Sequence, residues 1–252
     1  MVTKKSPLKA KPLRQAGQSV QEKIIEIFDD KVAPYILVPA FMIALACIEW
    51  YRSFFPAKPQ PLIVTALAVI SLLYCVPKII SIRRDISNLK QGRDGEIAVG
   101  QFLEILREDG CIVFHDIVGD KFNIDHVVLS EKGVYLIETK TYSKPTSGKP
   151  TVHYKKGILR IDGIGDASNI LNQVKAAAVW LKKVLKESTG KDFQIKPVIL
   201  FPGWWIESND YEDIWVLEAK GFPKFLSNAK EQITKEDKKL AAYHLSRYIR
   251  AL

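Results

Sequence analysis

Two uncharged apolar segments near the start of the chain limit its possible folds more than any other feature. The first runs from Val32 to Ile48 and the second from Pro61 to Pro77, with a short connection between them. Each has about 17 residues, and flanking residues extend the spans to about 32–50 and 61–80, enough to cross a hydrocarbon layer of roughly 30 Å. We therefore expect a two-helix transmembrane hairpin. Two helices buried in a soluble core are the alternative.

Positive charge is distributed unevenly around these segments. The tail, residues 1–31, and the stretch after the second segment are rich in Lys and Arg, whereas the connection contains only Arg52 and Lys58. Because cytoplasmic loops carry the excess of basic residues, we expect both termini in the cytoplasm and the connection outside. The protein is thus predicted to be a multi-pass protein of the inner (cytoplasmic) membrane, with the lipid bilayer as a partner. The net charge of +9 favours anionic partners such as nucleic acid.

The rest of the chain has the pattern of a soluble α/β domain. Residues 81–91 are expected to form a linker helix, and residues 92–252 the domain itself. A loop at Gln91–Gly95 leads into a helix capped by Asp94, which ends at Gly110. Further strands, one long amphipathic helix from about Ser168 and a closing helix follow. This order predicts a mixed sheet covered by helices on both faces.

The most informative stretch of the domain is NIDHVVLSEKGVYLIETK, residues 123–140. It has the pattern of two strands joined by a tight turn, which would bring Asp125 close to Glu138. Glu138 and Lys140 lie on one face of their strand, because successive side chains alternate. Two carboxylates that converge repel each other unless a cation lies between them, and hard divalent metals prefer carboxylate oxygen. The predicted chemistry is metal-assisted hydrolysis of a phosphodiester.

Other polar and aromatic residues give weaker signals. Glu96 lies in the first turn of a predicted helix, where the helix dipole favours an acid whatever its function. His126 follows Asp125 on the opposite face of the strand, so we expect a packed or surface histidine. Trp204 and Trp205 could stack on nucleic acid bases, although such a pair more often closes a core or an interface.

Three motifs together resemble the nuclease-related domain (NERD) family of the restriction-endonuclease-like, PD-(D/E)xK superfamily. They are GRDGE at 92–96, the hairpin at 123–140, and SNILNQVKAAAVWL at 168–181, and the resemblance covers roughly residues 90–205. It implies a restriction-endonuclease-like mixed sheet flanked by helices, which binds a divalent metal, Mg²⁺ or Mn²⁺, and cleaves phosphodiester bonds.

The resemblance also implies a role for each matching residue. Asp125 and Glu138 take the positions of the two metal-binding acids, with the backbone carbonyl of Thr139 completing the ligand set. Lys140 takes the position of the catalytic lysine. The family's acid on the first helix corresponds to Glu96, and its glutamine on the later helix to Gln173. Ile124 stands where the superfamily's nominal motif has proline, which weakens a strict match but leaves every chemical group present.

The sequence therefore predicts a membrane-anchored, metal-dependent nuclease, acting on DNA rather than RNA. Two alternatives remain open: a non-catalytic nucleic-acid-binding or membrane-associated module on a nuclease fold, and an RNA-cleaving enzyme.

Overall fold

The computed structural model describes residues 11–55, 58–119, 122–145 and 148–251. The chain divides into two compact units, Val20–Gln91 and the residues up to Ser19 together with Gly92–Leu252. We call the second the α/β unit. Its fold is α/β, with mixed sheets flanked by helices, as the sequence predicts.

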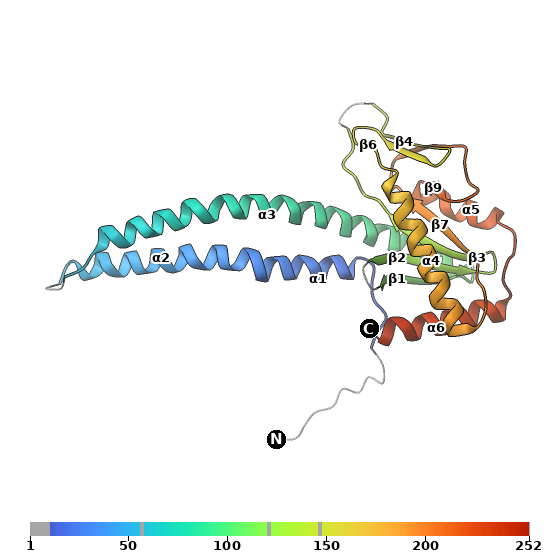
Figure 1. Ribbon diagram of the computed structural model, residues 1–252, viewed down its shortest axis with the longest axis horizontal. Coiled ribbons are helices and arrows are strands. Elements are labelled where there is room, and N and C mark those ends of the chain that lie inside the picture. Colours follow the sequence, from blue (N-terminus) through green and yellow to red (C-terminus); the bar gives the residue numbers. More distant parts are fainter. Residues whose placement is uncertain (1–10, 56–57, 120–121, 146–147, 252) are drawn as a thin grey trace, which may run out of the picture. The chain divides into compact units, whose positions relative to one another are not determined.

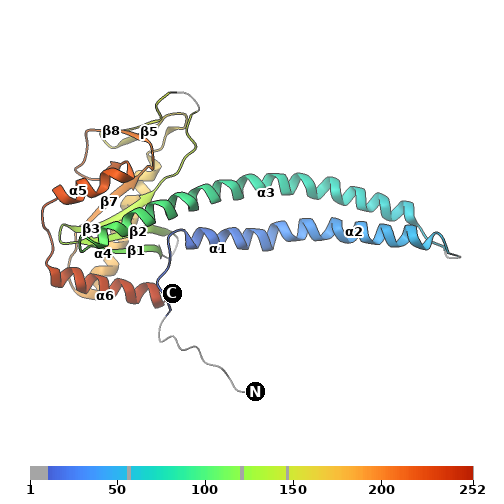
Figure 2. The ribbon, with the colours of Figure 1, turned by 180° about the vertical axis from the view of Figure 1, so that it is seen from behind.

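The smaller unit is helical. It contains α1 (Gln18–Ile27), a π-helical turn (Phe28–Val32), α2 (Ala33–Arg52) and the first part of α3 (Pro61–Glu104). Within this unit α2 and α3 lie side by side (Figures 1 and 2), and the indole N–H of Trp50 donates to Thr65 Oγ1 at 3.0 Å.

Both predicted spans are helical. The helical stretches Gln18–Arg52 and Pro61–Arg107 each contain a segment that is long and apolar enough to cross a membrane. Apolar side chains along them, such as Leu62 at 73% exposure, face outward. That exposure is unlike a helix of a soluble core, where such side chains are usually buried.

One sequence expectation about α3 is wrong. The residues expected to form a loop and a helix cap at Asp94 lie inside α3, which continues to Glu104 and ends in a 3₁₀ turn, Ile105–Arg107. Glycine weakens a helix interior by about 1 kcal/mol relative to alanine, so its presence needs a reason. At Gly95 the reason is space: a Cβ there would lie 1.7 Å from Thr141 Oγ1.

The central sheet of the α/β unit has five strands in the order β1-β2-β3-β7-β9. Their bounds are β1 (Ile112–Val118), β2 (Asn123–Ser130), β3 (Gly133–Thr139), β7 (Ile195–Leu200) and β9 (Trp215–Leu217). The first three strands are antiparallel, whereas β7 and β9 continue the sheet in parallel with β3. The parallel pairing places the C-terminal ends of β3 and β7 at one edge.

Helices cover both faces of this sheet. On one face lie α4 (Asn169–Thr189) and α6 (Lys235–Ala251), whose apolar stripes share a core with β1, β2 and β3 (Figure 1). The other face packs against the C-terminal part of α3, from Val99 onward, and α5 (Phe222–Asn228) (Figure 2).

A second sheet has four strands in the order β6-β5-β4-β8, and it packs on the core that α4 and α6 share with the central sheet. It consists of β4 (Thr151–Lys155), β5 (Ile158–Ile161), β6 (Gly165–Asp166) and β8 (Trp205–Ser208). Val152, Tyr154, Leu159 and Ile161 are buried in the core, whereas the alternate residues face solvent. This sheet therefore has one solvent-exposed face.

Candidate active site

The hairpin of β2 and β3 brings the first two acids together. His126 pairs with Ile137, so Asp125 and Glu138 are opposite one another one step further along. The Thr139 backbone N–H donates to Asp125 Oδ2 at 2.6 Å, and Lys140 Nζ donates to Glu138 Oε1 at 2.7 Å. Asp125, Glu138, Thr139 and Lys140 thus form one contiguous group at the end of β3.

Glu96 reaches the same group from α3. Burial, with the charges of Asp116 and Glu138, raises the pKa of Glu96 to about 7. The pKa of Asp125 is raised well above its usual range by burial, then by the charges of Glu138 and Glu96. The three carboxylates Glu96, Asp125 and Glu138 are therefore close enough to repel one another, and we call them the acidic cluster.

Lys140 is the positive group of the cluster. Burial alone would lower the pKa of Lys140, but the negative charges of Glu138 and Asp125 outweigh it and raise that pKa. With every group ionised, one ammonium faces three partly buried carboxylates, and charge that is removed from water needs compensation.

The donor chemistry of the cluster fits a hard divalent cation, which prefers several carboxylate oxygens. Asp125 and Glu138 each use only one oxygen in the hydrogen bonds above. In the described part of the chain, no three Asp, Glu, His or Cys side chains are arranged as a finished metal-binding group. The fit is thus one of chemistry and electrostatics.

Asp116 on β1 is a further acid that sequence reasoning missed. It lies between the pairs His115–His126 and Ile117–Ile124, level with Asp125, and it adopts a φ of 51°. Its side chain is buried and accepts from Arg14 Nε at 2.5 Å. A charged residue inside the apolar strand CIVFHDI was the available signal, because a buried carboxylate requires a partner.

That partner comes from the segment before α1. The Ser19 backbone N–H also donates to Asp116 at 3.0 Å, and Ala16 packs so closely on α3 that a Cβ at Gly100 would lie 2.6 Å from its methyl. The basic tail is therefore not uniformly exposed to solvent, since residues 14–19 pack on the α/β unit. Residues 1–10 lie outside the described part of the chain.

A column of polar side chains ends at Thr139. His115 Nε2 lies 2.7 Å from Glu104 Oε1, the Nδ1 atoms of His115 and His126 are 2.8 Å apart, and His126 Nε2 is 3.4 Å from Thr139 Oγ1. A carboxylate only accepts, so with both rings neutral His115 donates to Glu104, His126 donates to His115, and Thr139 donates to His126. Burial, with the charge of His115, lowers the pKa of His126 well below its usual value.

Gln173 is not brought to the cluster by any contact. Its side chain is exposed on α4 and makes no hydrogen bond to another described residue. The two adjacent tryptophans separate: Trp204 is 2% exposed and belongs to the core, whereas Trp205 is 51% exposed. His126 is fully buried, in keeping with the packed histidine expected from the sequence.

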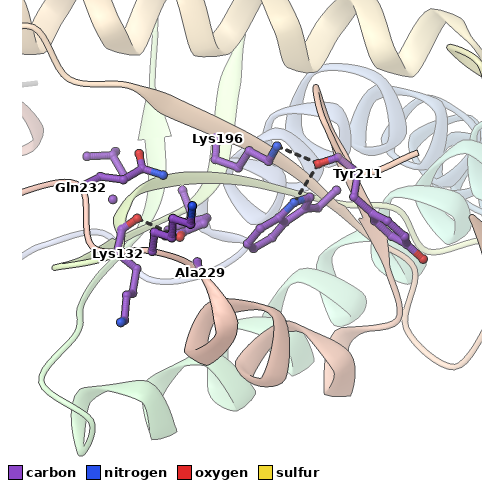
Figure 3. A pocket seen from close by; sticks show the side chains of 10 residues that line it. Lys132, Lys196, Tyr211, Ala229 and Gln232 are labelled. Atoms are coloured by element: carbon purple, nitrogen blue, oxygen red, sulfur yellow. Dashed lines mark hydrogen bonds between the residues drawn. The ribbon is translucent and has the colours of Figure 1, made fainter. Parts of the chain in front are cut away.

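A separate pocket of about 300 Å³ lies at the other end of β3 (Figure 3). Tyr135 and Lys196, which pair across β3 and β7, both line it. Lys196 Nζ donates to the carbonyl of Tyr211 at 2.9 Å, and the Trp215 indole N–H donates to the same oxygen at 3.1 Å. No residue of the acidic cluster lines this pocket.

Comparison with known proteins identifies one family. Residues 91–202 match the family model of NERD, described as a nuclease-related domain, which belongs to the PD-(D/E)xK-like nuclease superfamily. The matched range contains Glu96, Asp125, Glu138 and Lys140. No curated protein and no solved structure matches the chain.

Proposed function

Because residues 91–202 belong to the nuclease-related domain family, we propose that the protein is a membrane-anchored, divalent-metal-dependent nuclease that hydrolyses phosphodiester bonds of DNA. The observation that carries the proposal is the acidic cluster with Lys140 beside it. A family match indicates a nuclease-related fold, but only a site can support a reaction. Here the site contains mutually repelling, partly buried carboxylates together with a cationic group.

Each residue has a proposed role. Asp125, Glu138 and the Thr139 carbonyl would hold Mg²⁺ or Mn²⁺, and such an ion would supply Lewis-acid chemistry for phosphodiester hydrolysis. Lys140 orients the attacking water and stabilises the negative charge that develops on the phosphate oxygens. Glu96 completes the outer part of the site. Gln173, exposed on α4, contacts the nucleic acid backbone rather than the metal.

The hydrogen bonds of the site support these roles. The Thr139 N–H fixes Asp125 through one oxygen, and the histidine column holds the Thr139 hydroxyl on the other side of the strand. Lys140 is fixed by Glu138 at the strand end. Such preorganised groups aid catalysis because they need little rearrangement as charge develops.

The test is cleavage by the full-length chain in detergent, because a domain cut off before residue 92 would lack Arg14 and Ser19. Plasmid, linear DNA and RNA are incubated with Mg²⁺, Mn²⁺ or chelator. Asp125→Ala, Glu138→Ala and Lys140→Ala should each reduce DNA cleavage at least about a hundredfold. Lys239→Ala, at an exposed position on α6, is the control and should cleave normally.

The same experiment decides the alternatives. Equal activity of wild type and the three site variants would refute the catalytic assignment. Binding without cleavage under every metal condition would favour a non-catalytic nucleic-acid-binding module, an alternative compatible with the ion pair between Lys140 and Glu138. Cleavage of RNA but not DNA would identify an RNA-cleaving enzyme instead.

We further propose that the two apolar helices anchor the protein in the cytoplasmic membrane, with both termini and the α/β unit in the cytoplasm. The exposed apolar side chains of the two helices support the anchor. The contact between Arg14 and Asp116 supports the topology, because it requires the segment before the first span to lie on the same side of the membrane as the rest of the α/β unit.

Topology can be tested by labelling single cysteines in intact cells with an impermeant maleimide, after replacing Cys47, Cys75 and Cys111 by serine. Pro59→Cys should label from outside and Ser6→Cys only after the membrane is opened. The reverse pattern would invert the orientation, and labelling at both positions would refute the two-span hairpin.

A further inference from the structure

We propose that Trp205, with the ammonium groups of Lys149 and Lys144, forms a stacking subsite for an unpaired base of the nucleic acid strand that the acidic cluster binds. The inference rests on the proposed function and makes it more specific, because it identifies single-stranded or frayed segments as the preferred substrate.

The position of Trp205 is not explained by packing. Its neighbour Trp204 fills the core, whereas Trp205 lies on the solvent-facing side of β8 and remains 51% exposed. Lys149 Nζ lies 3.1 Å from the centroid of the Trp205 ring. The ammonium group therefore covers one face of the indole, which leaves the opposite face for a base and places a positive charge near the adjoining phosphate.

The two lysines carry positive charge that nearby acids do not neutralise. Among the described residues, no carboxylate lies within salt-bridge distance of the ammonium groups of Lys144 and Lys149. Lys144 Nζ lies against the backbone of Gly203, where an added Cβ would be only 2.6 Å away. Gly203 has a φ of 73°, so a glycine suits both this conformation and the close approach.

The subsite lies at the same edge of the central sheet as the acidic cluster. Thr139 pairs with Leu200, and the Lys140 N–H donates to the carbonyl of Leu200 at 2.9 Å. Trp205 follows Leu200 by five residues, so their Cα atoms are at most about 18 Å apart. That is about five steps of a nucleic acid strand at 3.4 Å each.

The loops that leave the two strands are also tied together. The Trp205 N–H donates to the carbonyl of Pro150 at 2.9 Å, and Trp205 pairs with Thr151 where β4 and β8 run side by side. Lys144 and Lys149 lie in the two described stretches between Lys140 and Thr151, on either side of residues 146–147. A strand that runs from the acidic cluster toward β8 would therefore meet these ammonium groups and the indole.

The geometry favours a particular class of substrate. A base inside a duplex already stacks on its neighbours, so it can use the indole only after leaving the helix, which costs a few kcal/mol. An unpaired base avoids that cost. Single strands and frayed ends should therefore bind in preference to blunt duplexes.

The test measures binding without cleavage, using the full-length chain with Asp125→Asn in chelator. The probes are labelled oligothymidylate, oligouridylate and a blunt DNA hairpin. Trp205→Ala should weaken binding of both single strands by roughly tenfold to a hundredfold while changing hairpin binding little. Trp205→Phe should retain most of the affinity, because it keeps an aromatic face.

Two further variants sharpen the test. Lys149→Ala should lower the slope of log affinity against log salt by about 0.7, the value for one phosphate contact on a single strand. Tyr243→Ala is the matched control, because Tyr243 is a 58% exposed ring on α6 with the Arg247 guanidinium 5.9 Å from its centroid. It should bind every probe like its parent.

The outcomes separate this inference from the proposed function. An equal loss for single strands and hairpin, or the same loss in Tyr243→Ala, would overturn it. Intact Trp205-dependent binding in a protein whose wild type never cleaves would refute the nuclease proposal and support the subsite. Wild-type cleavage without Trp205-dependent binding would do the reverse.

Discussion

Gly95 allows a direct test of how α3 is fitted against the end of β3. A Cβ at this position would lie 1.7 Å from Thr141 Oγ1, 2.7 Å from its Cβ and 3.0 Å from its Cγ2. Non-bonded carbon atoms prefer about 3.5–4.0 Å, so Gly95→Ala forces the helix or the strand end to move by more than 1 Å. Glu96, the next residue, must move with the helix.

Two opposing effects set the magnitude. Replacing a helical glycine by alanine stabilises the helix by about 1 kcal/mol, whereas overpacking costs about 1–3 kcal/mol. The upper value applies here because Thr141 is a short β-branched residue that cannot swing away. Gly92 lies three residues earlier in the same helix and has no atom within 4 Å of its added Cβ. Gly92→Ala should therefore stabilise by up to about 1 kcal/mol, and Gly95→Ala should destabilise by about 1–2 kcal/mol.

Urea unfolding of the full-length chain in detergent measures both values. Tryptophan fluorescence is a suitable probe because four of the five tryptophans lie in the α/β unit. Gly95→Ala should also lose the proposed nuclease activity. Adding Thr141→Gly to Gly95→Ala should restore much of the lost stability. The reasoning is refuted if Gly95→Ala is as stable as Gly92→Ala, or if Thr141→Gly shows no coupling to it.

Three further predictions concern buried charge and hydrogen bonding. The pKa of Glu96 is about 7 in the fold and 4.5 ordinarily, so its ionisation should cost metal-free protein about 3 kcal/mol as the pH rises from 4.5 to 7, and Glu96→Gln should reduce this fall in chelator. His126→Ala should cost about 3 kcal/mol in urea unfolding, because it leaves a cavity and unpaired partners, whereas exposed His153→Ala should cost well under 1. Arg14→Ala should cost about 2 kcal/mol, because Asp116 stays buried and keeps only its bonds to Ser19; an unchanged unfolding midpoint would contradict this.

The fold class could be predicted because its signals are local. Short runs of β-forming apolar residues on either side of a turn indicate the strands of residues 123–140, and a 3.6-residue period indicates α4. The mixed sheet flanked by helices is confirmed. The family resemblance is likewise confirmed. The break expected before Glu96 was wrong, because glycine and aspartate that suggested a helix start lie inside a helix whose glycine makes room for Thr141.

The acidic cluster shows the same limit. The proximity of Asp125 and Glu138 could be predicted because one short turn connects their strands. The contact of Asp116 with Arg14 could not, since the two are 102 residues apart and no local pattern reports such a pairing. Gln173 was assigned a role from its motif position alone. Its exposed position on α4 leaves contact with nucleic acid as the proposed role.

The ion pair between Arg14 and Asp116 also has a consequence for folding kinetics. At a synthesis rate of roughly 5–20 residues per second, Arg14 leaves the ribosome about 5–20 s before its partner. Contacts so distant in sequence are costly to close and tend to form after the transition state. Loss of this contact should then accelerate unfolding while leaving the folding rate nearly unchanged. The segment before α1 would thus dock after the transition state and lengthen the lifetime of the folded protein.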